Sequence, residues 1–233
     1  MSEWRAVNGE GRSTAPPHSP LATLRSLDPE IALWNFAQRL MRLDRRLLCR
    51  VPHAGNDVFL TFDDGPDPVA TPWVLDTLAR HHAKATFFLI GRNAEAHPQL
   101  VQRIRHEGHT IGNHTWDHAD AWRTPRADYL GSVERGHALT GSTLFRPPYG
   151  HLTPGLVRTL HRRHRIVQWD VIAGDFKADL DALRMAERVV SRTRPGSIVV
   201  FHDTQRCLPK LEAALPGVLI TLAKQGMHFR PLS

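Results

Sequence analysis

The chain has 233 residues, of which 41% are hydrophobic and 23% charged, with a formal net charge of +7. This composition is typical of a globular protein and excludes a disordered or collagen-like chain. The two cysteines exclude a disulfide-rich scaffold, and no apolar run reaches the ~20 residues that a membrane-spanning helix needs. The basic residues are spread along the chain without a nucleic-acid-binding motif, so we expect no nucleic-acid partner.

The N-terminal part differs in composition from the rest. Residues 1–20 are rich in Gly, Ser, Thr and Pro, which predicts a disordered segment. They contain no apolar stretch typical of a secretory signal, so the expected location is cytoplasmic by default. Asp28 and Pro29 are typical of a helix start, and they predict an amphipathic helix over residues 28–50 with arginines between its apolar positions. We favour packing of this helix on the following domain over a weak contact with a membrane surface.

From residue 57 to residue 233, short β-rich runs alternate with stretches of helical pattern. Such alternation predicts parallel strands with helices outside, and the number of units in this length favours one α/β domain, a compact (β/α) barrel of about seven parallel strands. The strands are expected at 58–62, 85–90, 109–113, 144–146, 166–169, 198–201 and 227–230. The helices are expected at 71–82, 94–107, 127–139, 154–163, 180–193 and 208–225.

Reactive side chains follow five of these strands. The clusters read DDGP, HTWDH, RPPYG, WDVIAGDF and FHD, in chain order. Because the carboxyl ends of parallel strands meet at one edge of the sheet, we expect these clusters to converge there.

Two of the clusters predict a metal site. His114 and His118 are four residues apart, so on one turn of helix they share a face and suit a single metal ion. Two imidazoles and a carboxylate are a ligand set of catalytic divalent metals, and Asp63 or Asp64 supplies the carboxylate. The other aspartate is then placed to take a proton from water. Taken alone, DDGP is equally typical of a turn, and one HxxxH pair in a chain with 15 histidines is weak evidence.

The remaining clusters supply the other groups of a hydrolytic site. Arg146 can form two parallel hydrogen bonds to the aspartate that acts as base and keep that carboxylate ionised. Pro147 and Pro148 stiffen the next turn, which makes the Tyr149 backbone N–H a candidate oxyanion donor. His202 is a candidate acid for the leaving group, and Asp175 a candidate partner that orients it.

With these residues in place, the chain resembles the NodB-homology polysaccharide deacetylases, carbohydrate esterase family 4. The motifs TFDDGP (61–66), HTxxH (114–118), RPPYG (146–150) and the final His-Asp (202–203) occur in order. The resemblance implies removal of N-acetyl, less often O-acetyl, groups from a carbohydrate polymer or oligomer, with release of acetate. It implies a distorted (β/α) barrel of the NodB-homology type and one divalent metal, usually zinc and sometimes cobalt or nickel. Carried over, Asp63 is the base, and the metal ligands are Asp64, His114 and His118. Arg146 then holds Asp63, Tyr149 supplies the oxyanion N–H, and Asp175 orients the acid His202.

The fourth motif departs from the family pattern WxxDxxDW. Ile172 stands in place of its first aspartate and Phe176 in place of its last tryptophan, which affects substrate binding more than chemistry. Trp116, Trp122, Tyr149 and Phe176 are candidates for stacking on sugars, although tryptophans at these spacings equally suit a core. Hydrolysis of a different amide or a cyclic imide on the same metal site is the alternative function. A metal- or glycan-binding protein without turnover is disfavoured because the base, its arginine and the acid are all present.

Overall fold

The sheet is built around strand β2, Asp57–Asp63. Its apolar side chains are buried on both faces of the sheet, and Val58 and Leu60 are fully excluded from solvent. Burial on both faces is expected of a parallel strand that is covered by helices on one side and by packed side chains on the other. β2 pairs in parallel with β3 (Ala85–Leu89) and with β8 (Ile198–His202).

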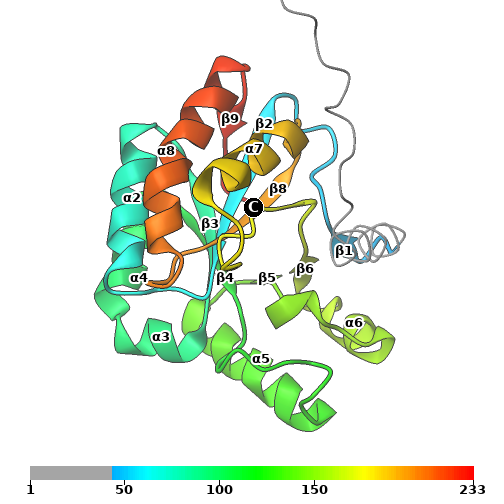
Figure 1. The fold of residues 1–233 in the computed structure, drawn as a ribbon. Helices are drawn as coiled ribbons and strands as arrows, with labels where there is room; N and C mark the ends of the chain where they lie inside the picture. Colours follow the sequence, from blue (N-terminus) through cyan, green and yellow to red (C-terminus); the bar gives the residue numbers. More distant parts are fainter. Residues whose placement is uncertain (1–43) are drawn as a thin grey trace, which may run out of the picture. The chain divides into compact units, whose positions relative to one another are not determined.

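The computed structural model describes residues 44–233, and their strands form one curled parallel sheet (Figure 1). The order across the sheet is β1-β6-β5-β4-β3-β2-β8-β7, and β9 pairs with β2. The remaining strands are β1 (Leu47–Leu48), β4 (Thr110–Asn113), β5 (Leu144–Phe145), β6 (Arg165–Val167), β7 (Val171–Ile172) and β9 (His228–Phe229). The predicted distorted barrel with outer helices is confirmed as a curled, partly open sheet, and the described residues contribute nine strands to it rather than about seven.

The helices lie outside the sheet, with α2, α4 and α8 along one flank (Figure 1). They are α2 (Ala70–Arg80), α3 (Gly91–Ala96), α4 (Pro98–His106), α5 (Arg126–Thr140), α6 (Pro154–Leu160), α7 (Ala182–Arg192) and α8 (Leu208–Lys224). One helix was expected over 94–107, but the chain forms two. His97 has a φ of −129°, and Pro98 starts α4 as its first residue. Proline disfavours helical geometry in the residue before it, so the break falls at His97.

The predicted helix over residues 28–50 is wrong at its C-terminal end. Residues 1–43 lie outside the described residues, and with them the predicted disordered segment, most of the helix and its membrane contact. From Asp44 onward the chain turns, with the Asp44 carboxylate accepting from the Arg46 N–H at 3.0 Å, and then forms β1. Leu47 and Leu48 pair with Ile166 and Val167, so this segment adds a strand to the sheet. The sheet therefore begins before the predicted domain start at residue 57.

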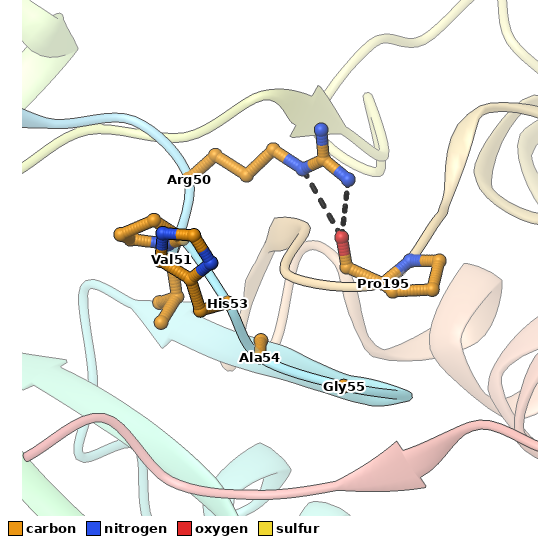
Figure 2. A pocket seen from close by; sticks show the side chains of 7 residues that line it. Arg50, Val51, His53, Ala54, Gly55 and Pro195 are labelled. Atoms are coloured by element: carbon orange, nitrogen blue, oxygen red, sulfur yellow. Dashed lines mark hydrogen bonds between the residues drawn. The ribbon is translucent and has the colours of Figure 1, made fainter.

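The core is a large cluster around β2, β3, β8 and the helices α2, α7 and α8, with a smaller one under α5 and α6. In the part of the chain that the structure describes, no helix is long and apolar enough to cross a membrane. Figure 2 shows a pocket formed by residues 50–55 and Pro195, where Arg50 donates to the Pro195 carbonyl. These residues precede β2 and β8, so the pocket lies at the amino edge of the sheet, whereas the reactive side chains follow the carboxyl ends of the strands.

Candidate active site

The two adjacent aspartates both belong to the carboxyl edge of the sheet. Asp63 is the last residue of β2, in register with Phe88 and His202 on the neighbouring strands. Asp64 has a φ of 75°, in the left-handed region, so the regular strand ends at Asp63. The Asn93 side chain donates to the Asp64 carbonyl at 2.8 Å and holds this turn in place. Because the strand geometry is broken between them, the two carboxylates need not point to opposite faces of the sheet.

Asp64, His114 and His118 come together as expected. The Asp64 Oδ1 atom lies 3.4 Å from His114 Nε2 and 3.1 Å from His118 Nε2. One ligand atom from each of the three residues lies within 4.8 Å of the others, as a shared metal ion requires. Although burial favours the protonated acid, the facing His114 and His118 rings hold the pKa of Asp64 well below its usual range. Asp64 Oδ1 is buried without a well-oriented hydrogen bond, so this atom fits a cation.

The HTWDH segment is a loop, so the prediction that His114 and His118 share a helix face is wrong. The loop follows β4, and Thr115 and His118 have φ values of 63° and 62°. Asn113 fixes its start: its Oδ1 accepts from the Thr115 N–H at 2.9 Å, and its Nδ2 donates to the Val133 carbonyl at 2.8 Å. These side-chain bonds replace the helical hydrogen-bond pattern, and the loop still brings both imidazoles to Asp64.

The loop is held from two further sides. The Gly91 N–H at the start of α3 donates to the Thr115 carbonyl at 2.9 Å, and the Arg92 N–H donates to the Trp116 carbonyl at 2.9 Å. His114 Nδ1 lies 2.8 Å from the Arg146 carbonyl, to which it donates. In a neutral ring, a donor at Nδ1 leaves the lone pair on Nε2, which faces Asp64, and this is the tautomer that a metal ligand needs.

Asp63 is held by a buried guanidinium. Arg146 Nη1 donates to Asp63 Oδ1 at 2.7 Å and to Thr61 Oγ1 at 2.6 Å, and its Nη2 donates to the Gln168 carbonyl at 3.1 Å. The Arg146 side chain is fully buried, with its Cζ atom 4.1 Å from the centre of the Phe88 ring. Burial lowers the pKa of Arg146, and the Asp63 carboxylate opposes that shift. The guanidinium therefore holds the Asp63 carboxylate in place next to the Asp64–histidine cluster.

The RPPYG segment places Tyr149 beside His118, one of the candidate metal ligands. Tyr149 lies in a short 3-10 turn, Pro148–Gly150, with a φ of 59°. Its ring packs edge-on against His118, with 4.7 Å between ring centres, and 55% of the residue is exposed. Within the described residues the Tyr149 N–H has no hydrogen-bond partner, so it is free to donate to a substrate.

Asp175 and His202 form a tight pair. His202 Nδ1 lies 2.9 Å from Asp175 Oδ1, and the His202 backbone N–H donates to Asp175 Oδ2 at 2.6 Å. Although burial favours the neutral ring, the Asp175 carboxylate raises the pKa of His202 to about 9. Cys207 lies within 4.8 Å of this pair, but burial raises the pKa of its thiol to about 12, which makes it a poor nucleophile.

The structure also assigns supporting contacts to residues that the sequence did not single out. Thr61 and Gln168 bind Arg146, while Asn93 and Asn113 hold the loops that carry Asp64 and His114. Asn113 had a signal, since it directly precedes the first histidine at a strand end. Asp203 is fully buried below the site, where it accepts from Thr71 Oγ1 at 2.5 Å and where burial raises its pKa well above the usual value.

Of the two residues at which the fourth motif departs from the family pattern, only Phe176 contacts the site. The Phe176 ring lies edge-on against His202, with 5.2 Å between ring centres. Ile172 lies in β7 and pairs with Val200, so it is part of the sheet. Trp116 carries the Arg135 guanidinium 3.3 Å from its ring centre and is only partly exposed, whereas Trp122 is 64% exposed.

Comparison with known proteins shows the family. Residues 50–165 match the family model described as polysaccharide deacetylase. A peptidoglycan-N-acetylglucosamine deacetylase of Bacillus cereus is 39% identical over 160 residues, which are 66% of this chain and 58% of the relative. A chitooligosaccharide deacetylase of Sinorhizobium fredii is 38% identical over 165 residues, 66% of this chain and 76% of that protein. The chain thus spans little more than half of the first relative's length.

A solved structure gives the same result for the fold. The Bc1960 peptidoglycan N-acetylglucosamine deacetylase, in complex with a hydroxamate, superposes with a TM-score of 0.75 at 34% identity. The match covers 80% of this chain and 91% of that one. The chain belongs to the polysaccharide deacetylase family, carbohydrate esterase family 4, as the motifs predicted.

Proposed function

We propose that this protein hydrolyses the acetamide bond of N-acetylglucosamine residues in a polysaccharide or oligosaccharide. One observation carries the proposal: a carboxylate held by a buried arginine, Asp63, lies next to an Asp64–His114–His118 cluster that fits a divalent cation. The substrate class is supported by the names of the relatives, which act on peptidoglycan N-acetylglucosamine or on chitooligosaccharides.

The metal ligands in this proposal are Asp64, His114 and His118. They fit a divalent cation because a buried carboxylate oxygen faces two imidazole Nε2 atoms, one of them fixed in its tautomer by the Arg146 carbonyl. A cation bound there supplies Lewis-acid chemistry, which polarises the acetyl carbonyl and makes water easier to deprotonate. Nitrogen and oxygen ligands in this ratio suit zinc, and cobalt or nickel are the alternatives.

The protein groups around that cluster then divide the reaction between them. Asp63 accepts the proton of the attacking water, while Arg146 keeps the Asp63 side chain in place. The new C–O bond forms at the acetyl carbon, and the Tyr149 N–H donates to the carbonyl oxygen as it gains negative charge. The C–N bond then breaks, and acetate is released.

The leaving nitrogen needs a proton. His202, whose raised pKa keeps it protonated at neutral pH, donates that proton to the sugar amine, and Asp175 holds the imidazole. The reaction needs a proton donor and a proton acceptor at the same pH, because water loses a proton as the amine gains one. His202 is the donor in this proposal, and Asp63 is the acceptor.

The second candidate function keeps the same groups and changes the substrate. Hydrolysis of another non-peptide amide or of a cyclic imide is favoured by the loss of the usual polar and indole groups at Ile172 and Phe176. An O-acetyl substrate is a further alternative, for which the leaving oxygen takes the proton from His202.

The test is an acetate-release screen with the full 233-residue chain. The substrates are chitin oligomers, peptidoglycan fragments and acetylated xylan, each with zinc, with cobalt and with a chelator. We expect release from the N-acetylglucosamine substrates with metal and none with the chelator. Release from xylan alone would move the proposal to O-acetyl groups, and release from none would reject the proposed function.

A further inference from the structure

Trp122 is an exposed indole with a defined orientation. It is 64% exposed, although a tryptophan is among the residues that a folded chain gains most by burying. One face of the ring is stacked on His151, with 3.4 Å between ring centres and 9° between ring planes. The covered face is therefore occupied by an imidazole, and the high exposure of the residue leaves the other face to solvent.

A carboxylate anchors the His151 ring and the backbone of Trp122. Asp120 Oδ1 accepts from the Trp122 backbone N–H at 2.9 Å and bonds to His151 Nδ1 at 2.9 Å. The turn is closed by the Arg123 and Thr124 N–H groups, which donate to the Asp120 carbonyl at 3.0 and 2.9 Å. The stack thus joins the loop after His118 to the loop after Tyr149. The His151 ring is held by its bond to Asp120, and the indole is held by its stacking on that ring.

The stack is connected to the candidate active site through aromatic contacts. Tyr149 lies 4.7 Å from His118 and 5.7 Å from His151, measured between ring centres. A row of rings therefore runs from a metal ligand, His118, to the exposed indole of Trp122. Because two rings stand between them, the indole is placed for a neighbour of the reacting sugar rather than for the sugar whose acetyl group is hydrolysed.

The chemistry of the stack matches a sugar ring. A pyranose presents an apolar C–H face and a polar rim, and an indole covers the first while adjacent polar groups bind the second. Here the polar groups are His151 and Asp120, with the Arg123 side chain 88% exposed beside them. A core role for Trp122 is excluded by its exposure, in contrast to Trp116, which lies under Arg135.

We propose that Trp122, stacked on His151, forms a binding subsite for a sugar next to the one that is deacetylated. This inference rests on the proposed function, and it makes the protein select for oligosaccharide length. Covering roughly 50 Å² of apolar indole surface is worth about a factor of ten in affinity.

The test compares the N-acetylglucosamine dimer and hexamer as substrates of the zinc-loaded full chain. The quantity is the ratio of kcat/KM for the hexamer to kcat/KM for the dimer. We expect Trp122→Ala to lower this ratio about tenfold and Trp122→Phe, which keeps a flat ring, to retain most of it. The matched control is Ile220→Ala, which removes another exposed apolar side chain, on α8, and leaves the ratio as in the unchanged protein.

An unchanged ratio in Trp122→Ala would overturn the subsite, including the case in which activity on both oligomers falls equally. If the unchanged protein releases no acetate, the proposed function fails, and the subsite is then decided by binding. Calorimetry with the deacetylated glucosamine hexamer supports the subsite if Trp122→Ala binds it about tenfold more weakly. Equal affinities of the two proteins would overturn it.

Discussion

Replacing Arg146 with methionine tests whether this buried guanidinium holds the carboxylate of Asp63. Methionine keeps the apolar contact with Phe88 but removes the hydrogen bonds to Asp63, Thr61 and the Gln168 carbonyl. Asp63 is only 3% exposed, so its carboxylate is left without a partner or takes up a proton. Breaking a buried ion pair in this way costs about 3–5 kcal/mol of unfolding free energy. An Asp63 carboxylate that is protonated or displaced can no longer accept a proton from water, so the rate of acetate release should fall as well.

The assay is urea unfolding of Arg146→Met, Asp63→Asn and the double variant. We expect a coupling energy of at least about 2 kcal/mol, because the double variant leaves no unpaired buried charge. Arg103→Met is the matched control. Like Arg146, Arg103 is paired with carboxylates, in its case Asp76 and Glu107, but its side chain is 34% exposed. That variant should lose no more than about 1 kcal/mol. Additive effects of the two site substitutions would refute the reasoning.

Three further predictions follow from the structure. Zinc at about a hundred times its dissociation constant should raise the free energy of unfolding of the unchanged protein by about 2.7 kcal/mol. Thermal unfolding followed by calorimetry should show little of this gain in His118→Ala, because that variant lacks one of the three proposed ligands. Asp175→Asn should move the alkaline limb of the pH–kcat profile to lower pH, because Asp175 raises the pKa of His202 to about 9; an unmoved limb would exclude His202 as the acid. Burial lowers the pKa of His109 to about 4, and its Nδ1 accepts from the Ala85 N–H. The folded state therefore binds fewer protons, and stability should fall by about 1–2 kcal/mol from pH 7 to pH 5. Urea unfolding of His109→Gln should show a smaller loss, and an equal one would exclude His109 as the cause.

Much of the fold could be predicted because the periodic signals are local. The alternation of β-rich runs and helical patterns gave the order of β2 to α8 along the chain, apart from the two-residue strand β7 and the division of one predicted helix into α3 and α4. The errors arose where long-range pairing decides the structure. Leu47 and Leu48 fit a helical apolar pattern, yet they form a strand because Ile166 and Val167 offer a sheet edge. No pattern within residues 44–50 records that edge.

The candidate site likewise has parts that could be predicted from the sequence and parts that could not. The predicted residues of the metal cluster converge, because residues after parallel strands meet at one edge whatever the loops between them do. The local geometry of the HTWDH segment was not predictable from the HxxxH spacing. Asn113 and Gly91 hold that segment as a loop, and these hydrogen bonds depend on α3 and α5 being packed beside it. Two partners of Arg146, Thr61 and Gln168, could not be predicted either, because they lie far from Arg146 in the sequence and only the folded sheet brings them together.

The central claim is that Asp63 takes a proton next to a cation held by Asp64, His114 and His118. It is tested most directly by acetate release from the N-acetylglucosamine hexamer by Asp63→Asn, with the zinc content of the protein measured in the same sample. We predict one zinc per chain in both proteins and a rate about 10²–10⁴-fold lower in the variant, the usual contribution of a positioned base. A zinc-loaded variant that releases acetate at the unchanged rate would contradict the account.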